Sequence, residues 1–217
     1  MSDFPATGRN RVVRIPDRGH YDRPTVYAIL DAALICHVGL LQDGAPLVIP
    51  TLYARDGDDL LLHGASSSRL LRYLAGGGEV SVAVTLVDAL VLARSIFHHS
   101  VNYRSVVLFG RGQPVAAEAK PALLKRFSDK LIPGRWEHVR APSPNELKAT
   151  AIVRVPIELA SAKVRSGPAK DDAADMSLQT WAGIVPLQQT YLPPEADAAL
   201  PAGIPLPDHV RALYESD

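Results

Sequence analysis

The chain has 217 residues, of which 47% are hydrophobic and 21% charged. These values are typical of globular domains and exclude wholesale disorder. Lys and Arg together number 23, as do Asp and Glu, so the formal net charge is zero. We therefore expect neither a nucleic acid nor a membrane as partner. The single cysteine, Cys36, excludes an internal disulfide framework and a cysteine-rich zinc module.

The composition changes along the chain and predicts three parts. Residues 1–20 are rich in arginine and form an extended basic arm, 21–190 form the folded domain, and 191–217 form a tail. The last 26 residues hold five prolines and five acidic residues against one arginine, which favours a wrapping or loosely ordered segment. No apolar run reaches the roughly 18 residues of a membrane span, and the first residues lack the apolar core of a secretory signal. We expect a cytoplasmic protein.

The first half of the folded domain predicts a helix followed by three strands. Asp22 and Pro24 are typical of a helix start, and apolar residues at helical spacing extend this helix over about 23–34. Two tight-turn signals, Asp43-Gly44 and Asp56-Gly57-Asp58, then divide three strand-like runs into a meander. The three runs are Cys36–Gln42, Pro46–Arg55 and Asp59–His63.

The second half predicts long strands and two more helices. A short helix lies between Ser66-Ser67-Ser68 and Gly76-Gly77-Gly78, and an amphipathic helix covers Glu118–Lys130. The further strand predictions are Glu79–Arg94, Asn102–Val115, a sixth strand region at Ala149–Val164 and a short strand at Thr180–Leu187. About six antiparallel strands with three helices favour a mainly β, α+β fold, either a closed or a split barrel. A dinucleotide-binding fold is excluded because βαβ alternation and its glycine-rich turn are missing.

The segment Leu61–Arg69 carries the clearest chemical signal. Here a strand leads through His63, Gly64 and three serines into a helix start. Free backbone N–H groups, serine hydroxyls and the helix dipole favour a bound anion, and Arg69 adds a guanidinium donor. The alternative is that Ser68 and its neighbours only cap the helix while Arg69 is solvated.

Two further clusters contain polar side chains. The segment His98–Ser105 brings two imidazoles together with Asn102 and Arg104. Neighbouring residues on a strand point to opposite faces and no third ligand is visible, so we predict no metal site. Lys163 and Arg165 share one face of a strand, as a solvated edge or as a second anion contact. No nucleophile elbow and no Walker loop is present in the sequence.

In their order and spacing these segments resemble the pyridoxamine 5'-phosphate oxidase-like, FMN-binding family, and most closely its branch of flavin-nucleotide-binding and nitroimidazole-resistance proteins. The resemblance covers about residues 10–190. The matching stretches are Tyr21-Asp22, Cys36–Gly39, Pro46–Thr51, Leu62–Arg69, His98–Ser105, Glu146–Thr150, Ser161–Arg165 and Trp181–Gly183.

The resemblance implies a split β-barrel homodimer that binds FMN at the subunit interface. The residues that it assigns to the isoalloxazine ring are Val48, Ile49, Pro50 and Thr51. The residues that it assigns to the flavin phosphate are His63, Gly64, Ser68 and Arg69, with Asn102 and Arg104 from a neighbouring strand. The residues that it matches to contacts from the partner subunit are Lys163, Arg165 and Trp181.

The resemblance also implies an oxidoreductase that passes a hydride or electrons to a small-molecule acceptor, such as a nitro compound or a quinone. The chain lacks the C-terminal Arg-Leu-x-Pro ending of true pyridoxamine phosphate oxidases, so vitamin B6 oxidation is not expected. The alternative is a non-catalytic flavin carrier or a haem-binding protein of the same fold. FAD and haem are the less expected cofactors, and His63, His98 or His99 would be the haem ligand.

Overall fold

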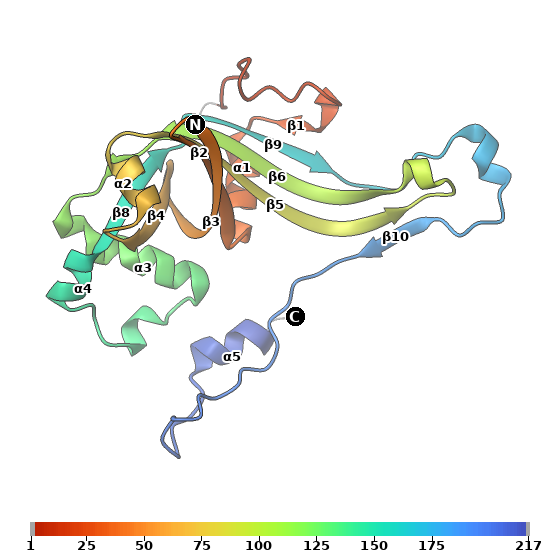
Figure 1. Cartoon of the computed structure of the whole chain (residues 1–217). Coiled ribbons are helices and arrows are strands. Elements are labelled where there is room, and N and C mark those ends of the chain that lie inside the picture. Colours follow the sequence, from red (N-terminus) through yellow and green to blue (C-terminus); the bar gives the residue numbers. More distant parts are fainter. Residues whose placement is uncertain (1–2, 216–217) are drawn as a thin grey trace.

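The computed structural model describes residues 3–215, which form one antiparallel sheet of ten strands together with five α-helices (Figure 1). The strands are β1 (Gly19–His20), β2 (Ile35–Gln42), β3 (Ala45–Asp56), β4 (Asp59–Ala65), β5 (Glu79–Leu92), β6 (Ser100–Arg111), β7 (Gln113–Pro114), β8 (Thr150–Pro156), β9 (Leu159–Arg165) and β10 (Gly183–Pro186). Their order is β1-β9-β6-β5-β2-β3-β4-β8-β7, and β10 pairs with β5. The sheet is open at β1 and β7, so the α+β split barrel predicted from the sequence is confirmed.

The predicted helices are confirmed, and two short ones are added. The first three are α1 (Arg23–Ala32), α2 (Arg69–Ala75) and α3 (Lys120–Leu131). The additional helices are α4 (Pro144–Ala149) and α5 (Asp208–Glu215). A reciprocal capping box between Ser143 and Glu146 starts α4. Helix α5 lies in the predicted tail, which therefore contains regular structure.

The prediction of one strand region at Ala149–Val164 is wrong. The structure divides it into β8, which pairs with β4, and β9, which pairs with β6. The two strands lie toward opposite ends of the sheet. The division occurs at Ile157, whose side chain is buried and whose N–H donates to the carbonyl of Asp58 at 2.7 Å. The structure has ten strands where about six were predicted. This strand break and the two-residue strands β1 and β7 explain most of the difference.

The main core lies inside the curled sheet and is closed by α1 and α2. Alternate residues of β2, such as Cys36 and Val38, are buried against Val26 and Leu30 of α1. A smaller cluster lies on the opposite face of β4, where Leu61 packs against Phe127 of α3. Sheet residues therefore face α1 on one side and α3 on the other near β4.

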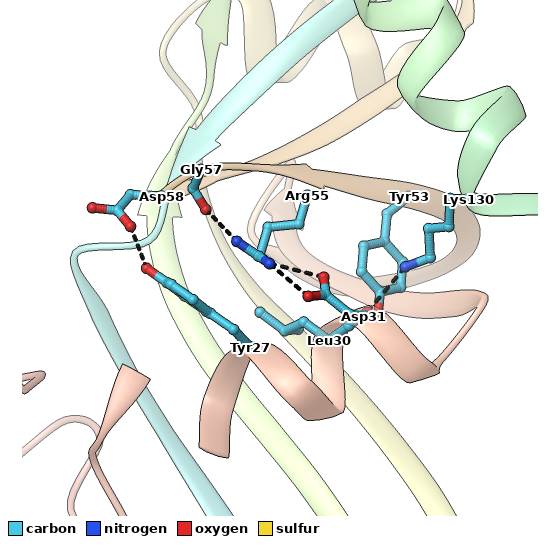
Figure 2. A network of polar contacts seen from close by, with 8 residues as sticks. All are labelled: Tyr27, Leu30, Asp31, Tyr53, Arg55, Gly57, Asp58 and Lys130. Carbon is cyan, nitrogen blue, oxygen red and sulfur yellow. Dashed lines mark hydrogen bonds and ion pairs between the residues drawn. The ribbon is translucent and has the colours of Figure 1, made fainter. Parts of the chain in front are cut away.

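A polar network joins α1 to β3 and α3 (Figure 2). The Leu30 carbonyl, near the end of α1, accepts hydrogen bonds from the Tyr53 hydroxyl at 2.5 Å and from Lys130 Nζ at 2.9 Å. Arg55 makes a bidentate contact with Asp31 at 2.8 and 2.5 Å. Burial lowers the pKa of Lys130 to about 8. These bonds satisfy a carbonyl that a helix end leaves free, so we assign the network a structural role.

The N-terminal arm is docked rather than free. Phe4 is buried in the main core, and Asn10 donates to the carbonyl of Ala160 at 2.7 Å. After β10 the tail leaves the ribbon of β5 and β6 and runs to α5, on the other side of the picture from the ribbon tip (Figure 1). None of the helices within residues 3–215 combines the length and the apolar character that a membrane span requires.

Candidate functional site

One face of the sheet is largely uncovered, and several predicted residues lie on it. Pro50, His37, Ala83 and Val107 are direct neighbours across β3, β2, β5 and β6, and Ser161 of β9 continues the row. The residues next to them on β2, β5 and β6 are buried in the main core, whereas Pro50, His37 and Val107 are exposed. We call the outward-facing residues of these five strands the outer face. A sheet that exposes apolar residues on a second face normally has that face covered by another layer.

The predicted isoalloxazine segment alternates between the two faces of β3. Val48 is 62% exposed and Pro50 is also exposed, so both belong to the outer face. Ile49 instead packs against the main core. Thr51, two residues along, is half-buried and pairs with the buried Cys36. Because strand side chains alternate, Val48 and Pro50 can contact a flat ring on the outer face while Ile49 cannot.

The barrel divides where β3 separates from β4. The ladder between these strands covers Tyr53–Asp56 of β3 and ends at the pair of Tyr53 with Leu62. The earlier residues of β3, from Ala45 to Leu52, pair with β2 alone. The seam therefore has the start of β3 on one side and His63 and Gly64 on the other. This seam brings Thr51 close to the predicted phosphate segment, because it lies two residues beyond the last β3–β4 pair.

His63 is the most unusual side chain at the seam. Its ring lies 4.2 Å from the Phe127 ring of α3, measured between centroids, and its Nδ1 is buried without a hydrogen-bond partner in the described part of the chain. Burial lowers the pKa of His63 below its usual 6.5. The imidazole is therefore held neutral, which is the form that can ligate a metal ion.

The loop Ala65–Ser68 and the start of α2 leave polar groups available. Ser68 is the N-cap residue of α2, but its side chain makes no capping hydrogen bond. The Arg69 side chain is exposed and makes no hydrogen bond or ion pair with any residue in 3–215. The serine side-chain cap of the alternative interpretation is therefore absent, whereas Arg69 is solvated as that alternative states. The guanidinium and the serine hydroxyls remain available for an anion.

Asn102 and Arg165 are brought together, but they bond to each other. The Arg165 guanidinium donates to the Asn102 amide oxygen, and the Asn102 amide donates to the carbonyl of Gly167 at 3.2 Å. Both side chains are buried. Arg104 makes a bidentate contact with Asp88, with distances of 2.8 to 3.2 Å. These three residues therefore have structural partners, and their contact with a flavin stays a prediction.

The last two predicted residues are far apart along the sheet. Lys163 pairs with Ser105 on the outer face, and its Nζ donates to the carbonyl of Arg14 in the arm at 2.9 Å. Trp181 is 66% exposed and lies within the strand predicted for Thr180–Leu187, but the observed strand β10 begins only at Gly183. The sequence analysis missed Asp88, which sits where the register between β5 and β6 shifts. An acid within an otherwise apolar strand was the available signal.

Comparison with known proteins identifies the family. The family model described as pyridoxamine 5'-phosphate oxidase matches residues 22–164, which is most of the barrel and all of the seam. The chain belongs to this family, and the resemblance seen in the sequence is confirmed. A comparison with curated proteins finds no match.

Two solved structures are similar over nearly the whole chain. The flavocytochrome Anf3 from Azotobacter vinelandii is 40% identical, with a TM-score of 0.89 and coverage of 96% of this chain and 97% of that one. The FAD and haem binding protein from Mycobacterium smegmatis is 37% identical, with a TM-score of 0.88 and coverage of 91% and 97%. A protein described as a 5-nitroimidazole antibiotic resistance protein from Bacteroides thetaiotaomicron is 20% identical, with a TM-score of 0.58 and coverage of 67% and 86%, and shares the fold.

Proposed function

We propose that the protein binds a flavin and a haem and transfers electrons. The observation that carries this proposal is the pair of relatives at 40% and 37% identity, one named a flavocytochrome and the other an FAD and haem binding protein. Both are matched along almost their full length. Their names favour FAD together with haem over the FMN alone that we expected from the sequence.

The residues at the seam fit a flavin. A phosphate group carries negative charge, and Arg69 with the hydroxyls of Ser66–Ser68 offers donors that no described residue uses. An isoalloxazine ring is flat and largely apolar, and the outer face offers Val48 and Pro50. Thr51 follows Pro50 along β3 and lies two residues before the β3–β4 ladder, between the proposed ring contacts and the phosphate segment. In this proposal Arg69 anchors the cofactor, and Val48 and Pro50 shield one face of its ring.

His63 is the histidine that best fits a haem. Its orphaned Nδ1 and lowered pKa keep the imidazole neutral, and Phe127 fixes the ring orientation. His98 lies at the tip of the ribbon, 3.3 Å from an Asp172 oxygen, and the neighbouring His99 is exposed. His98 also lies beside an aromatic ring, that of Phe97, but Phe97 is 86% exposed, whereas His63 packs against the buried Phe127 and is the better match to an apolar macrocycle.

A bound flavin would supply hydride and single-electron chemistry, and a bound haem single-electron transfer. The chain itself would bind, orient and shield these groups. The proposed activity is therefore that of an oxidoreductase with a small-molecule acceptor, as expected from the sequence. Steady-state oxidation of a reduced nicotinamide with quinone or nitro acceptors would separate this activity from that of a cofactor carrier, which would show no turnover.

Two pairs of variants test the site directly. Arg69→Ala removes a charge-assisted contact worth about 1.5–3 kcal/mol, so flavin should bind at least about tenfold more weakly in a fluorescence titration. Arg72→Ala, an exposed arginine on the same helix, is the matched control and should bind normally. His63→Leu should abolish the haem Soret band after haem addition, whereas His99→Leu should retain it. Equal behaviour within either pair would contradict the corresponding assignment.

A further inference from the structure

The distal half of the β5–β6 ribbon extends beyond the barrel. Strand β2 pairs with β5 only at Ser81–Ala83, near the start of β5. The ribbon continues to a tip that contains the short helical turn Ile96–His98, and it projects away from the barrel (Figure 1). Strand β10 pairs with β5 at Ala89–Leu92 and supports the ribbon on one edge.

The tip presents two apolar side chains on a fixed support. Ile96 is 87% exposed and Phe97 is 86% exposed. Arg94, just before them, donates from its backbone N–H and its guanidinium to the Asp171 carboxylate at 2.9 and 2.8 Å. The Asp171 side chain is only 2% exposed. The ion pair between Arg94 and the buried Asp171 carboxylate therefore holds two adjacent large apolar side chains in water, and contiguous exposed apolar patches mark interaction sites.

A second apolar feature lies at the other end of the molecule. A cavity of about 480 Å³ opens between the end of α3 and the tail. Its apolar lining includes Ile132, Leu200, Ile204, Leu206 and Val210. A volume in this range encloses small apolar groups in other proteins, and two side chains of the size of isoleucine and phenylalanine are such groups. We call this cavity the tail pocket.

The tip and the tail pocket cannot meet within one chain. The ribbon tip and α5 lie on separate sides of the molecule, and the ribbon is a paired two-stranded element (Figure 1). Exposed apolar residues continue along the ribbon from the outer face toward the tip, at Val87, Leu90 and Val101. The same partner that covers the outer face would therefore also cover the ribbon. A second copy of this chain carries both the apolar tip, Ile96 and Phe97, and the tail pocket, so the two contacts can be reciprocal as a two-fold dimer requires.

We propose that Ile96 and Phe97 of one chain insert into the tail pocket of a second copy, and that the second copy makes the reciprocal contact. This proposal rests on a homodimer in which a second copy covers the exposed outer face. It assigns the ribbon the role of an exchanged arm, and it assigns the tail the role of its receptor. The tail would then order against the partner rather than serve as a loose extension.

Cross-linking of the full-length chain tests the contact. Cys36 is buried, so introduced cysteines are the accessible thiols. The double variant Phe97→Cys with Ile204→Cys, treated with a short bismaleimide, should give a covalent dimer on a denaturing gel. Each single variant should not, and neither should Phe97→Cys combined with Ala122→Cys on the exposed surface of α3. Strong linking by Phe97→Cys alone, or a linked monomer from the double variant, would overturn the proposal.

Because Phe97→Cys removes the side chain proposed to make the contact, a second measurement tests the contact without cross-linking. Ile96→Ser with Phe97→Ser should raise the dimer dissociation constant at least about tenfold in analytical ultracentrifugation. Leu192→Ser, at a tail residue that is 76% exposed, should not. A dimer of unchanged affinity would contradict the exchanged arm. Flavin and haem uptake by the same samples separates the two proposals. A colourless protein that still cross-links would refute the cofactor proposal alone, and a coloured one that does not would refute the arm alone.

Discussion

At the scale of single residues, Asn102 acts as the partner of a buried guanidinium. Arg165 is buried and donates to the Asn102 amide oxygen and, at 3.5 Å, to the carbonyl of Pro168. A buried charged donor that loses its acceptor pays the full cost of desolvation. The same amide holds the carbonyl of Gly167, where φ is +89° and glycine is favoured. Asn102 therefore fixes the exit of the chain from β9.

We predict that Asn102→Ala lowers the free energy of unfolding by about 2 kcal/mol, because Arg165 is left buried without its acceptor. Urea denaturation of the cofactor-free protein measures this loss. Ser105→Ala is the control, since the Ser105 hydroxyl makes only a 3.3 Å contact with a carbonyl. A variant that keeps its stability but binds flavin weakly would instead identify Asn102 as a direct flavin contact.

His63 predicts a pH dependence of stability. Burial places its folded-state pKa below 6.5, so the unfolded chain binds more protons as pH falls through this window. The free energy of unfolding should therefore decrease on acidification. Between about pH 7.5 and about pH 5.5, the cofactor-free wild type should lose more stability than His63→Phe, which cannot titrate. His99→Phe should behave as the wild type does. Equal losses in wild type and His63→Phe would show that His63 is not held neutral by the fold.

At the scale of elements, α5 contacts the helical turn Trp136–His138, which follows α3, through a pair of histidines. The rings of His138 and His209 stack with centroids 4.6 Å apart, and the buried His209 Nε2 has no hydrogen-bond partner among residues 3–215. Burial, His138 and Arg135 lower the pKa of His209, and Asp208 opposes them. Two neutral rings can stack, whereas two imidazolium ions would repel each other.

We predict that acid releases the tail. Because the docked state favours neutral His209, proton uptake below its usual pKa of 6.5 favours the undocked state. Limited proteolysis should cut the tail faster at about pH 5.5 than at about pH 7.5, after correction for protease activity on a free peptide. His209→Phe keeps the stacking and removes the charge, so its tail should stay equally protected at both values. An unchanged cleavage rate in the wild type would contradict the histidine contact.

Local signals in the sequence were sufficient for the first hairpin turn and for the start of α1. Asp43 and Gly44 have φ of +51° and +76°, which is the hairpin turn that an Asp-Gly pair favours. Asp22 caps α1 through Thr25 as predicted. The break at Ile157 has no such signal, because an apolar residue fills the turn and its N–H is satisfied by a residue almost a hundred positions earlier. Helix α5 was hidden by the prolines that precede it.

The candidate site was also predictable only where its signals are local in the sequence. The segment from His63 to Arg69 is contiguous, so its helix start and the Arg69 guanidinium could be predicted from local sequence. The pairing of Asn102 with Arg165 spans 63 positions, and no local pattern indicates which donor meets which acceptor. The outward direction of Val48 and the inward direction of Ile49 depend on which face of β3 meets the core.

At the scale of the whole molecule, the outer face predicts a homodimer. Val107, His37 and Pro50 are exposed in the middle of a sheet whose other face is a closed core. Light scattering should give twice the chain mass at micromolar concentration. Val107→Glu places a charge in the centre of this face and should shift the protein to monomers, whereas Ala122→Glu on exposed α3 should not. A monomeric wild type would contradict the dimer.

The measurement that tests the cofactor proposal most directly is the absorption spectrum of the freshly purified protein, before and after reduction with dithionite. The account predicts the two broad bands of an oxidised flavin together with a haem Soret band. Reduction should bleach the flavin bands and shift the Soret band. A colourless protein that also takes up no added FMN, FAD or haem would contradict the proposal, while the split-barrel fold and the family would stand.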